Sequence, residues 1–316
     1  MRPPAFADDD SFRVWRNDPA QSLPLAVDIA HSHGLPCDDP QFFVTGTNLV
    51  VGLDDRLILK VFPPLLRAQF VSERATLSAL RGKLGIPIPE IVVEGGRDGW
   101  PYLVITRLPG VLASEAWPRL PEVQKERLLA ELGAVIAEVQ RVPPGSLAEI
   151  EPGWAEFMRG QIAGCRARHA RLGLAPKFLE GLDDLLRDAG ELIPMQPQPV
   201  ILTGEYIPEN FLLTSRGDEW RLAGLIDFGD VMTGWREYDL LGPSAFMSAG
   251  RPRRVRSLFE GFGYARAEMN FELKRRLMAL MLLHRASDPI RHICIENWQD
   301  EADDLVQLQE LIWPTE

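Results

Sequence analysis

Short apolar runs separated by turn-forming residues fill the first third of the chain and predict a small antiparallel sheet. Apolar runs bounded by Gly, Pro, Asn or Asp are typical of strands joined as hairpins. Among them, Phe70, Leu77 and Leu80 recur at helical spacing, and Glu73 lies on the same stripe. The expected strands cover residues 42–45, 48–53, 56–62, 90–94 and 100–106, and the helix covers residues 67–84.

The remaining segments are mostly helical in pattern, with apolar residues three and four positions apart. Helices are expected over residues 24–34, 121–141, 153–171, 176–192, 237–249, 267–286 and 300–313. Residues 1–20 are polar and acidic, and we expect them to form a loosely attached arm. The pattern predicts an α+β protein in which this arm precedes a small β-rich lobe (21–106) and a larger helical lobe (107–316).

One stretch of the helical half, residues 199–230, departs from this pattern. Three short apolar runs within it predict buried strands, and the last two can pair through a turn at 214–219. Glu205 and Asn210 follow the first run, and Asp227 follows the third. If the last two runs pair, Asn210 and Asp227 lie at the same end of the ribbon. A carboxylate and an amide oxygen there would suit Mg²⁺.

A lysine interrupts one of the predicted strands, which is otherwise apolar. Lys60 stands within Leu-Ile-Leu-Lys-Val-Phe, at residues 57–62, and the ordinary interpretation is an edge-strand lysine that reaches solvent. An isolated buried charge is costly, whereas a paired one costs much less. Since Glu73 lies on the apolar stripe of the following helix, we predict a buried Lys60–Glu73 ion pair instead.

Few other motifs carry chemistry. Gly46-Thr47-Asn48 lies in the turn between the first two strands, where backbone amides can cover a phosphate, although most such turns only join strands. The sequence contains no GxxxxGK[ST] phosphate loop, no HExxH and no GxSxG. We interpret the segment at 261–263, Gly-Phe-Gly, as a helix end.

Composition narrows the classes of function. The 316 residues carry a formal net charge of −11, which argues against nucleic acid or an anionic membrane as a partner. The same charge is compatible with a cationic small molecule. Three widely separated cysteines form no disulfide or metal pattern, and no apolar segment resembles a membrane span or a secretory signal. We therefore expect a cytoplasmic protein, with its oligomeric state left open.

The order of these features resembles that of the aminoglycoside phosphotransferase family, whose fold is similar to that of protein kinases. Members carry His-Gly-Asp-x-x-x-x-Asn followed by Ile-Asp-Phe-Gly-Asp. The matching segments are Thr-Gly-Glu-Tyr-Ile-Pro-Glu-Asn at 203–210 and Ile-Asp-Phe-Gly-Asp at 226–230, within a resemblance that covers about residues 42–245. No protein-kinase activation segment follows, so hygromycin-type and other small-molecule kinases are the more similar relatives. The resemblance implies a bilobal fold, with one helix in an antiparallel N-lobe and a mainly helical C-lobe.

The resemblance also implies a role for each matching residue. ATP-dependent phosphate transfer to a hydroxyl of a small, aminoglycoside-like molecule would use Glu205 as the base and Mg²⁺ held by Asn210 and Asp227. The groups implied in ATP binding are Gly46, Thr47, Asn48, Lys60, Glu73 and the backbone of Thr106 and Leu108.

Two residues of the first motif depart from the family pattern. Glu205 replaces an aspartate and moves the carboxylate outward by roughly 1.5 Å, and a displacement of about 1 Å can cost on the order of a hundredfold in rate. Thr203 replaces a histidine that braces this loop. Three functions stay open: an antibiotic-type phosphotransferase, a catalytically impaired pseudokinase, and a metabolic kinase acting on choline, homoserine or a sugar. Glu237 and the acids at 296–304 could meet a cationic substrate, or could form a solvated helix face.

Overall fold

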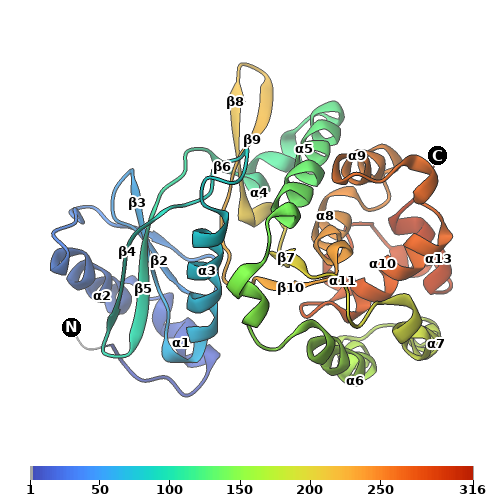
Figure 1. Cartoon of the computed structure of the whole chain (residues 1–316), viewed down its shortest axis with the longest axis horizontal. Helices are drawn as coiled ribbons and strands as arrows, with labels where there is room; N and C mark the ends of the chain where they lie inside the picture. Colours follow the sequence, from blue (N-terminus) through green and yellow to red (C-terminus); the bar gives the residue numbers. More distant parts are fainter. Residues whose placement is uncertain (1–2, 316) are drawn as a thin grey trace. The chain divides into compact units, whose positions relative to one another are not determined.

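The computed structural model describes residues 3–315 and divides the chain into two compact units (Figure 1). Unit 1 contains the residues up to Lys83 together with Pro87–Pro109 and Gly224–Val231. Unit 2 contains Leu84–Ile86, Gly110–Ala223 and the residues from Met232 onward. No helix within residues 3–315 is long and apolar enough to cross a membrane. The three cysteines are free thiols, in agreement with their spacing.

Unit 1 is built on the predicted antiparallel sheet. Its strands are β1 (Gln41–Phe43), β2 (Leu49–Gly52), β3 (Leu57–Val61), β4 (Ile91–Arg97) and β5 (Trp100–Thr106), in the order β1-β2-β3-β5-β4. All five predicted strands are present, with ends shifted by up to three residues. In the register, Lys60 of β3 lies opposite Val50 on one side and Leu103 on the other. Lys60 is therefore on an interior strand, and the edge-strand interpretation is wrong.

Helices cover both faces of this sheet. Alternation along β3 sends Leu59 and Val61 into one core, which they share with α1 (Asp9–Arg16) and α2 (Pro19–Ser32). The predicted long helix, α3 (Arg67–Leu80), contacts β4 and β5 and supplies the partner of Lys60 on the other face.

The N-terminal segment contains a helix, α1, that packs against the sheet. The prediction of a loosely attached arm is therefore wrong for this helix. Phe12 and Trp15 of α1 are only 2% and 8% exposed, and their rings lie 5.8 and 5.6 Å from that of Trp100. Arg16 donates to the carbonyl of Asn48 at 3.2 Å. Large aromatic side chains bury enough area to dock a short helix. Helix α1 was not predicted, because its acidic first turn makes the average composition of the segment polar.

Unit 2 is mainly helical. Its longer helices are α5 (Glu122–Arg141), α6 (Trp154–Leu172), α7 (Pro176–Leu192), α9 (Pro252–Phe262), α10 (Phe271–Leu283) and α13 (Leu305–Ile312). The expected helix at 237–249 is instead a 3₁₀ turn (Arg236–Leu240), the short α8 (Leu241–Pro243) and a π turn (Ser244–Ser248). Helix α9 was not predicted, although Gly263 ends it with φ +109° as expected of a helix end.

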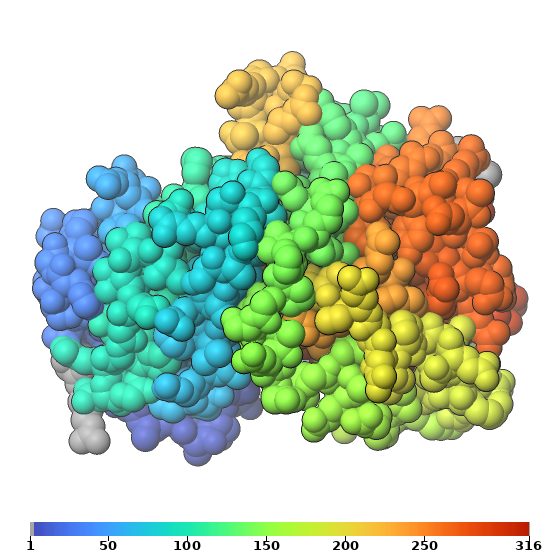
Figure 2. All heavy atoms as spheres, in the orientation of Figure 1, coloured from blue at the N-terminus to red at the C-terminus, as the bar shows by residue number. Residues whose placement is uncertain are grey.

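The ribbon expected within residues 199–230 is present. Strand β7 (Val200–Leu202) pairs with β10 (Met232–Gly234), and β8 (Phe211–Arg216) lies between β6 (Val111–Leu112) and β9 (Glu219–Leu225). The tip of the β8–β9 hairpin stands out from the surface in the space-filling view (Figure 2).

Side chains of α5 hydrogen-bond the backbone of β9. Glu131 accepts from the amide of Leu222 at 3.1 Å, and Gln124 accepts from the amide of Trp220 at 3.2 Å. Arg127 donates to the carbonyl of Trp220 at 2.6 Å. A helix face thus satisfies backbone groups that an edge strand leaves without partners.

Candidate active site

Unit 1 pairs the lysine of β3 with two carboxylates. The ammonium of Lys60 lies 2.7 Å from Oε1 and 2.5 Å from Oε2 of Glu73, and 3.2 Å from Oδ1 of Asp227. Lys60 is 5% exposed and Glu73 is 1% exposed. The predicted internal ion pair is therefore confirmed, and Asp227 adds a third charged group to it.

Burial and mutual attraction act in opposite directions on these three groups. Burial alone would lower the pKa of Lys60, but Asp227 and Glu73 more than offset it, so this pKa lies above its ordinary value. Burial raises the pKa of Glu73, against the attraction of Lys60. Burial also disfavours ionisation of Asp227, yet the Lys60 ammonium outweighs it and the pKa of Asp227 is lowered. Lys60 therefore stays protonated, as a fixed cation for an anionic ligand must.

A strained turn holds Asp227 in place. Its φ is +65°, a region that few residues other than glycine adopt. The amide of Gly229 donates to Asp227 Oδ1 at 3.4 Å, and the ring of Phe228 is 1% exposed. Beyond the turn, the hydroxyl of Ser72 in α3 donates to the carbonyl of Val231 at 3.0 Å. The conformation is fixed by packing on both sides, as strained functional turns require.

The hairpin of Gly46, Thr47 and Asn48 is held by α3. Gly46 has φ +88°, and a Cβ atom there would meet no other atom within 4 Å. Thr47 and Asn48 both donate to Oε1 of Gln69 at 3.0 Å, and Gln69 in turn donates to Asp230 at 3.4 Å. The hairpin is therefore tied to the turn that carries Asp227. Gln69 was not predicted from the sequence, because a glutamine within a helix carries no pattern that indicates a functional role.

The residues predicted to contact adenine offer one donor and one acceptor. The amide of Thr106 already donates to the carbonyl of Glu90 at 2.9 Å, so only the Thr106 carbonyl can serve a ligand. The amide of Leu108 makes no hydrogen bond within the described part of the chain. The side chain of Leu108 packs against Gly224, where a Cβ would lie 2.6 Å from Leu108 Cδ1.

In unit 2, the loop after β7 carries the second set of predicted residues. The side-chain amide of Asn210 donates to the carbonyl of Glu205 at 3.0 Å and lies 3.5 Å from its Oε2. The amide of Ile207 donates to the same carbonyl at 2.8 Å. Glu205 and Asn210 are thus brought together, with the amide group of Asn210 oriented by the loop.

Two side chains from distant segments hold the start of this loop. Asp239 accepts from the amides of Thr203 at 3.2 Å and Gly204 at 2.8 Å. His284 lies 3.1 Å from the carbonyl of Gly204. Burial raises the pKa of Asp239 to about 7, while the two amides act to lower it. Neither Asp239 nor His284 was identified from the sequence.

The oxygen atoms of Asn210 and Asp227 fit Mg²⁺ by type. Asn210 turns its nitrogen toward Glu205, which leaves its oxygen Oδ1 to serve as a ligand. Asp227 has a lowered pKa and so stays ionised. No cluster of three His, Cys, Asp or Glu side chains that could hold a metal occurs among residues 3–315. Asn210 and Asp227 each offer an oxygen of the kind that Mg²⁺ binds in proteins.

The acidic face expected to meet a cationic substrate is partly committed elsewhere. Glu237 is 5% exposed and accepts a hydrogen bond from the hydroxyl of Tyr264, so it does not belong to a surface. Asp304 caps α13 by accepting from the amide of Gln307 at 2.7 Å. Asp303 lies 3.8 Å from Lys177. A hydrogen bond, a helix cap and an ion pair thus account for Glu237, Asp304 and Asp303 without a ligand.

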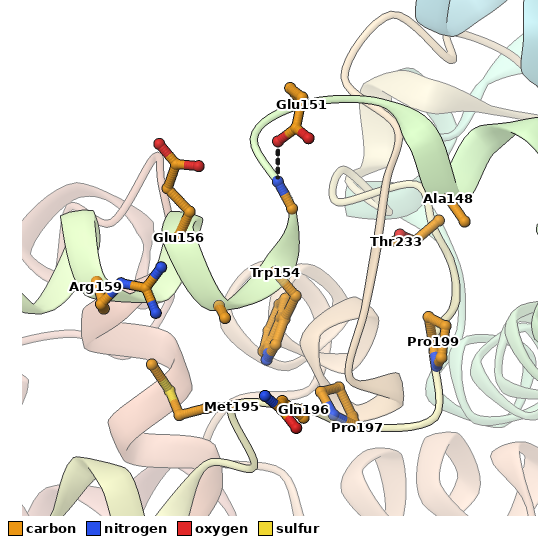
Figure 3. Close-up of a pocket in the computed structure, with 12 residues that line it drawn as sticks. Ala148, Glu151, Trp154, Glu156, Arg159, Met195, Gln196, Pro197, Pro199 and Thr233 are labelled. Carbon is orange, nitrogen blue, oxygen red and sulfur yellow. Dashed lines mark hydrogen bonds between the residues drawn. The ribbon is translucent and has the colours of Figure 1, made fainter.

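Unit 2 also contains a cavity of about 380 Å³ (Figure 3). Trp154 points toward the segment at 195–197, and its indole donates to the carbonyl of Pro194 at 2.8 Å. Glu151 accepts from the amide of Gly153 at 2.9 Å. Pro199, which precedes β7, is one of the residues that line the cavity. The cavity and the Glu205 loop are therefore at opposite ends of β7.

Comparison with known proteins identifies similar sequences and folds. The model of the phosphotransferase enzyme family (APH) matches residues 36–271. Aminoglycoside 3′-phosphotransferases from Streptomyces fradiae and Streptomyces ribosidificus are 28% and 32% identical over 160 and 154 residues, which are 49% and 46% of this chain. These matches span 57% and 53% of the two relatives, so the chain spans about half the length of the curated relatives it matches.

Among solved structures, the GDP complex of wild-type aminoglycoside 2′-phosphotransferase-IIIa has a similar fold. Its TM-score is 0.69 at 16% identity, and the match covers 92% of this chain and 97% of the other. The kinase-like α+β fold implied by the sequence motifs is thereby confirmed.

Proposed function

Because this chain belongs to the phosphotransferase enzyme family, we propose that it transfers the terminal phosphate of ATP to a hydroxyl group of a small molecule. The observation that carries the proposal is the buried Lys60, held 2.5 Å from Glu73 and 3.2 Å from Asp227. Phosphoryl transfer depends mainly on positioning and on neutralising phosphate charge. A lysine kept protonated beside an ionised aspartate is suited to that task.

In this proposal each residue acts on one part of the reactants. Lys60, oriented by Glu73, neutralises the phosphates that are not transferred. The Gly46–Asn48 hairpin covers the phosphates, while the Thr106 carbonyl and the Leu108 amide bind adenine. Asn210 and Asp227 would hold Mg²⁺, which when bound supplies positive charge to the phosphate oxygens.

Glu205 is the proposed base. The hydroxyl oxygen of the substrate forms a bond to the terminal phosphorus, and the bond from that phosphorus to the bridging oxygen of the nucleotide breaks. The hydroxyl proton passes to the Glu205 carboxylate, and the nucleotide leaves as the diphosphate. Since a misplacement of about 1 Å can cost on the order of a hundredfold, the longer side chain of Glu205 makes this the step most sensitive to loop geometry.

We propose an aminoglycoside-like substrate, hydroxylated and cationic. Support comes from the names of the two Streptomyces relatives and from the net charge of −11, which favours cations over anions near the protein. The relative solved with GDP makes the choice between ATP and GTP part of the test.

The test is nucleotide consumption with ATP or GTP and Mg²⁺ across aminoglycosides, neutral sugars, macrolides and metabolic alcohols such as choline and homoserine. We expect turnover with one or more aminoglycosides. Glu205→Gln removes the proton acceptor and should lower kcat by about a hundredfold or more. Glu209→Gln is the matched control, because it neutralises an exposed carboxylate four residues away and should leave kcat unchanged.

Three outcomes would contradict parts of the proposal. Full activity in the Glu205→Gln variant would remove Glu205 as the base. Turnover with neutral sugars alone would reject the cationic substrate. Binding of Mg·ATP without any turnover, unchanged by Glu205→Asp, would favour the pseudokinase. The observation that favours the pseudokinase is Thr203, because no hydrogen bond from its hydroxyl to the backbone of the Glu205 loop occurs within residues 3–315.

A further inference from the structure

His284 follows the end of α10 and reaches the loop that carries Glu205. Its Nε2 lies 3.1 Å from the carbonyl oxygen of Gly204, eighty residues earlier in the chain. Its Nδ1 lies 3.2 Å from the amide of Ala286, and its ring stacks on Tyr238 with centroids 4.5 Å apart and planes at 22°. All of these groups belong to unit 2.

The partners of His284 fix its tautomer. A carbonyl can only accept, so Nε2 carries a proton and donates it to Gly204. An amide can only donate, so Nδ1 is the acceptor for Ala286 and carries none. The imidazole is therefore neutral. Burial, with a smaller contribution from Arg285, lowers the pKa of His284 to about 3, so this state persists through the ordinary pH range.

The hydrogen bond from His284 acts on the peptide that leads into Glu205. The carbonyl of Gly204 and the amide of Glu205 belong to one planar peptide unit, so fixing the carbonyl fixes the plane. Gly204 has φ +72° and lacks a side chain that would limit its rotation. Asp239 holds the amide of Gly204 at 2.8 Å, which leaves the carbonyl side to His284.

The neighbouring side chain does not brace this peptide. Thr203 is 5% exposed, and no hydrogen bond from its hydroxyl to the Gly204–Glu205 peptide occurs within residues 3–315. We propose that His284 is a positioning residue, which orients the Gly204–Glu205 peptide and thereby sets where the Glu205 carboxylate meets the substrate hydroxyl. This inference rests on the proposed function, since it takes Glu205 as the base.

Two polar substitutions separate the contact to Gly204 from the contact to Ala286. In His284→Gln, the terminal amide nitrogen can take the place of Nε2 and donate to the Gly204 carbonyl. In His284→Asn, the shorter amide takes the place of Nδ1 and keeps the contact to Ala286 but does not reach Gly204. We expect His284→Asn to lower kcat by about ten- to a hundredfold with the nucleotide KM unchanged, and His284→Gln to recover most of the loss.

His169 offers a matched control. It is fully buried, and its Nε2 lies 2.9 Å from the carbonyl of Leu282, near the end of the same helix α10. The His169→Asn variant therefore removes a similar bond without touching the Glu205 loop. We expect it to lower thermal stability about as much as His284→Asn does, and to leave kcat unchanged.

Amide hydrogen exchange at Glu205 provides a readout that does not need turnover. We expect exchange there to be about tenfold faster in His284→Asn than in the wild type, His284→Gln or His169→Asn. Equal kcat values in His284→Asn and His169→Asn, or equal exchange rates, would overturn the proposal. If no substrate is turned over, or if Glu205→Gln stays active, the assignment of Glu205 as the base is wrong. The exchange rates at Glu205 still decide in that case whether His284 positions the loop.

Discussion

Among single residues, Lys60 shows how tightly the site and the stability of unit 1 are coupled. Its charge is removed from water at 5% exposure, and the carboxylates of Glu73 and Asp227 compensate for that loss. Removing one member of a buried ion pair leaves the other charge without a partner, which costs more than removing both. The pair was predictable because a lysine in an apolar strand and a glutamate on an apolar helical stripe both demand a partner.

We predict that Lys60→Met lowers the free energy of unfolding by about 3–5 kcal/mol, because Glu73 stays buried without its cation. The double variant Lys60→Met/Glu73→Leu should recover most of that loss. Arg74→Ala is the control: it breaks the exposed Arg74–Glu94 pair, whose side chains are 50% and 46% exposed, and should cost less than about 1 kcal/mol. Urea denaturation measures all three. Equal losses in the single and double variants would argue against the pair as the cause.

Other residues of the site could not be found from the sequence. His284 and Gly204 are eighty positions apart, and a histidine at the end of an apolar helix has no pattern that points to a loop. Gln69 is similar, since its two hairpin partners and Asp230 are identified only once α3 and the turns are placed. Hydrogen bonds between distant segments leave no periodic signal in the chain.

At the scale of elements, α5 and α9 approach each other closely at two glycines. A Cβ on Gly133 would overlap the carbonyl of Leu258 and lie 2.7 Å from the amide of Phe262. A Cβ on Gly261 would overlap the carbonyl of Ala130. Backbone atoms cannot move aside as side chains do. The sequence shows only that glycines occur in helical segments, where they are ordinarily unfavourable.

We predict that Gly133→Ala destabilises the protein by about 1–3 kcal/mol, because the added methyl forces the two helices apart. The matched substitution Gly164→Ala, in α6, meets nothing within 4 Å and should stabilise by up to about 1 kcal/mol through helix propensity. In thermal unfolding, we expect the midpoint temperature to fall for Gly133→Ala and to rise for Gly164→Ala. A stabilising Gly133→Ala would contradict it.

Across the molecule, burial shifts the pKa values of Asp239 and His284 in opposite directions, so these two groups give the stability opposite pH dependences. The pKa of Asp239 is raised by burial from 3.8 to about 7. At a pH between these two values, Asp239 is ionised in the unfolded chain but keeps its proton in the folded chain. Its contribution to the free energy of unfolding therefore falls as the pH rises. The pKa of His284 is lowered by burial from 6.5 to about 3, and its contribution rises with pH across that window.

We predict that the difference in unfolding free energy between the wild type and Asp239→Asn falls as the pH rises from about 4 to about 7, with a slope of up to about 1.4 kcal/mol per unit. Denaturation at several pH values measures this difference directly. A difference that does not change with pH would show that Asp239 titrates alike in both states.

Periodicity, local turn residues and charges placed among apolar residues were sufficient to predict the antiparallel sheet of unit 1, most of the helices, the Lys60–Glu73 pair and the family. The folded structure was needed to find that α1 packs against Trp100, that Gln69 joins the hairpin to the Asp227 turn, and that Asp239 and His284 hold Gly204. These contacts join segments that are far apart in sequence, and their geometry depends on how intervening helices and strands pack.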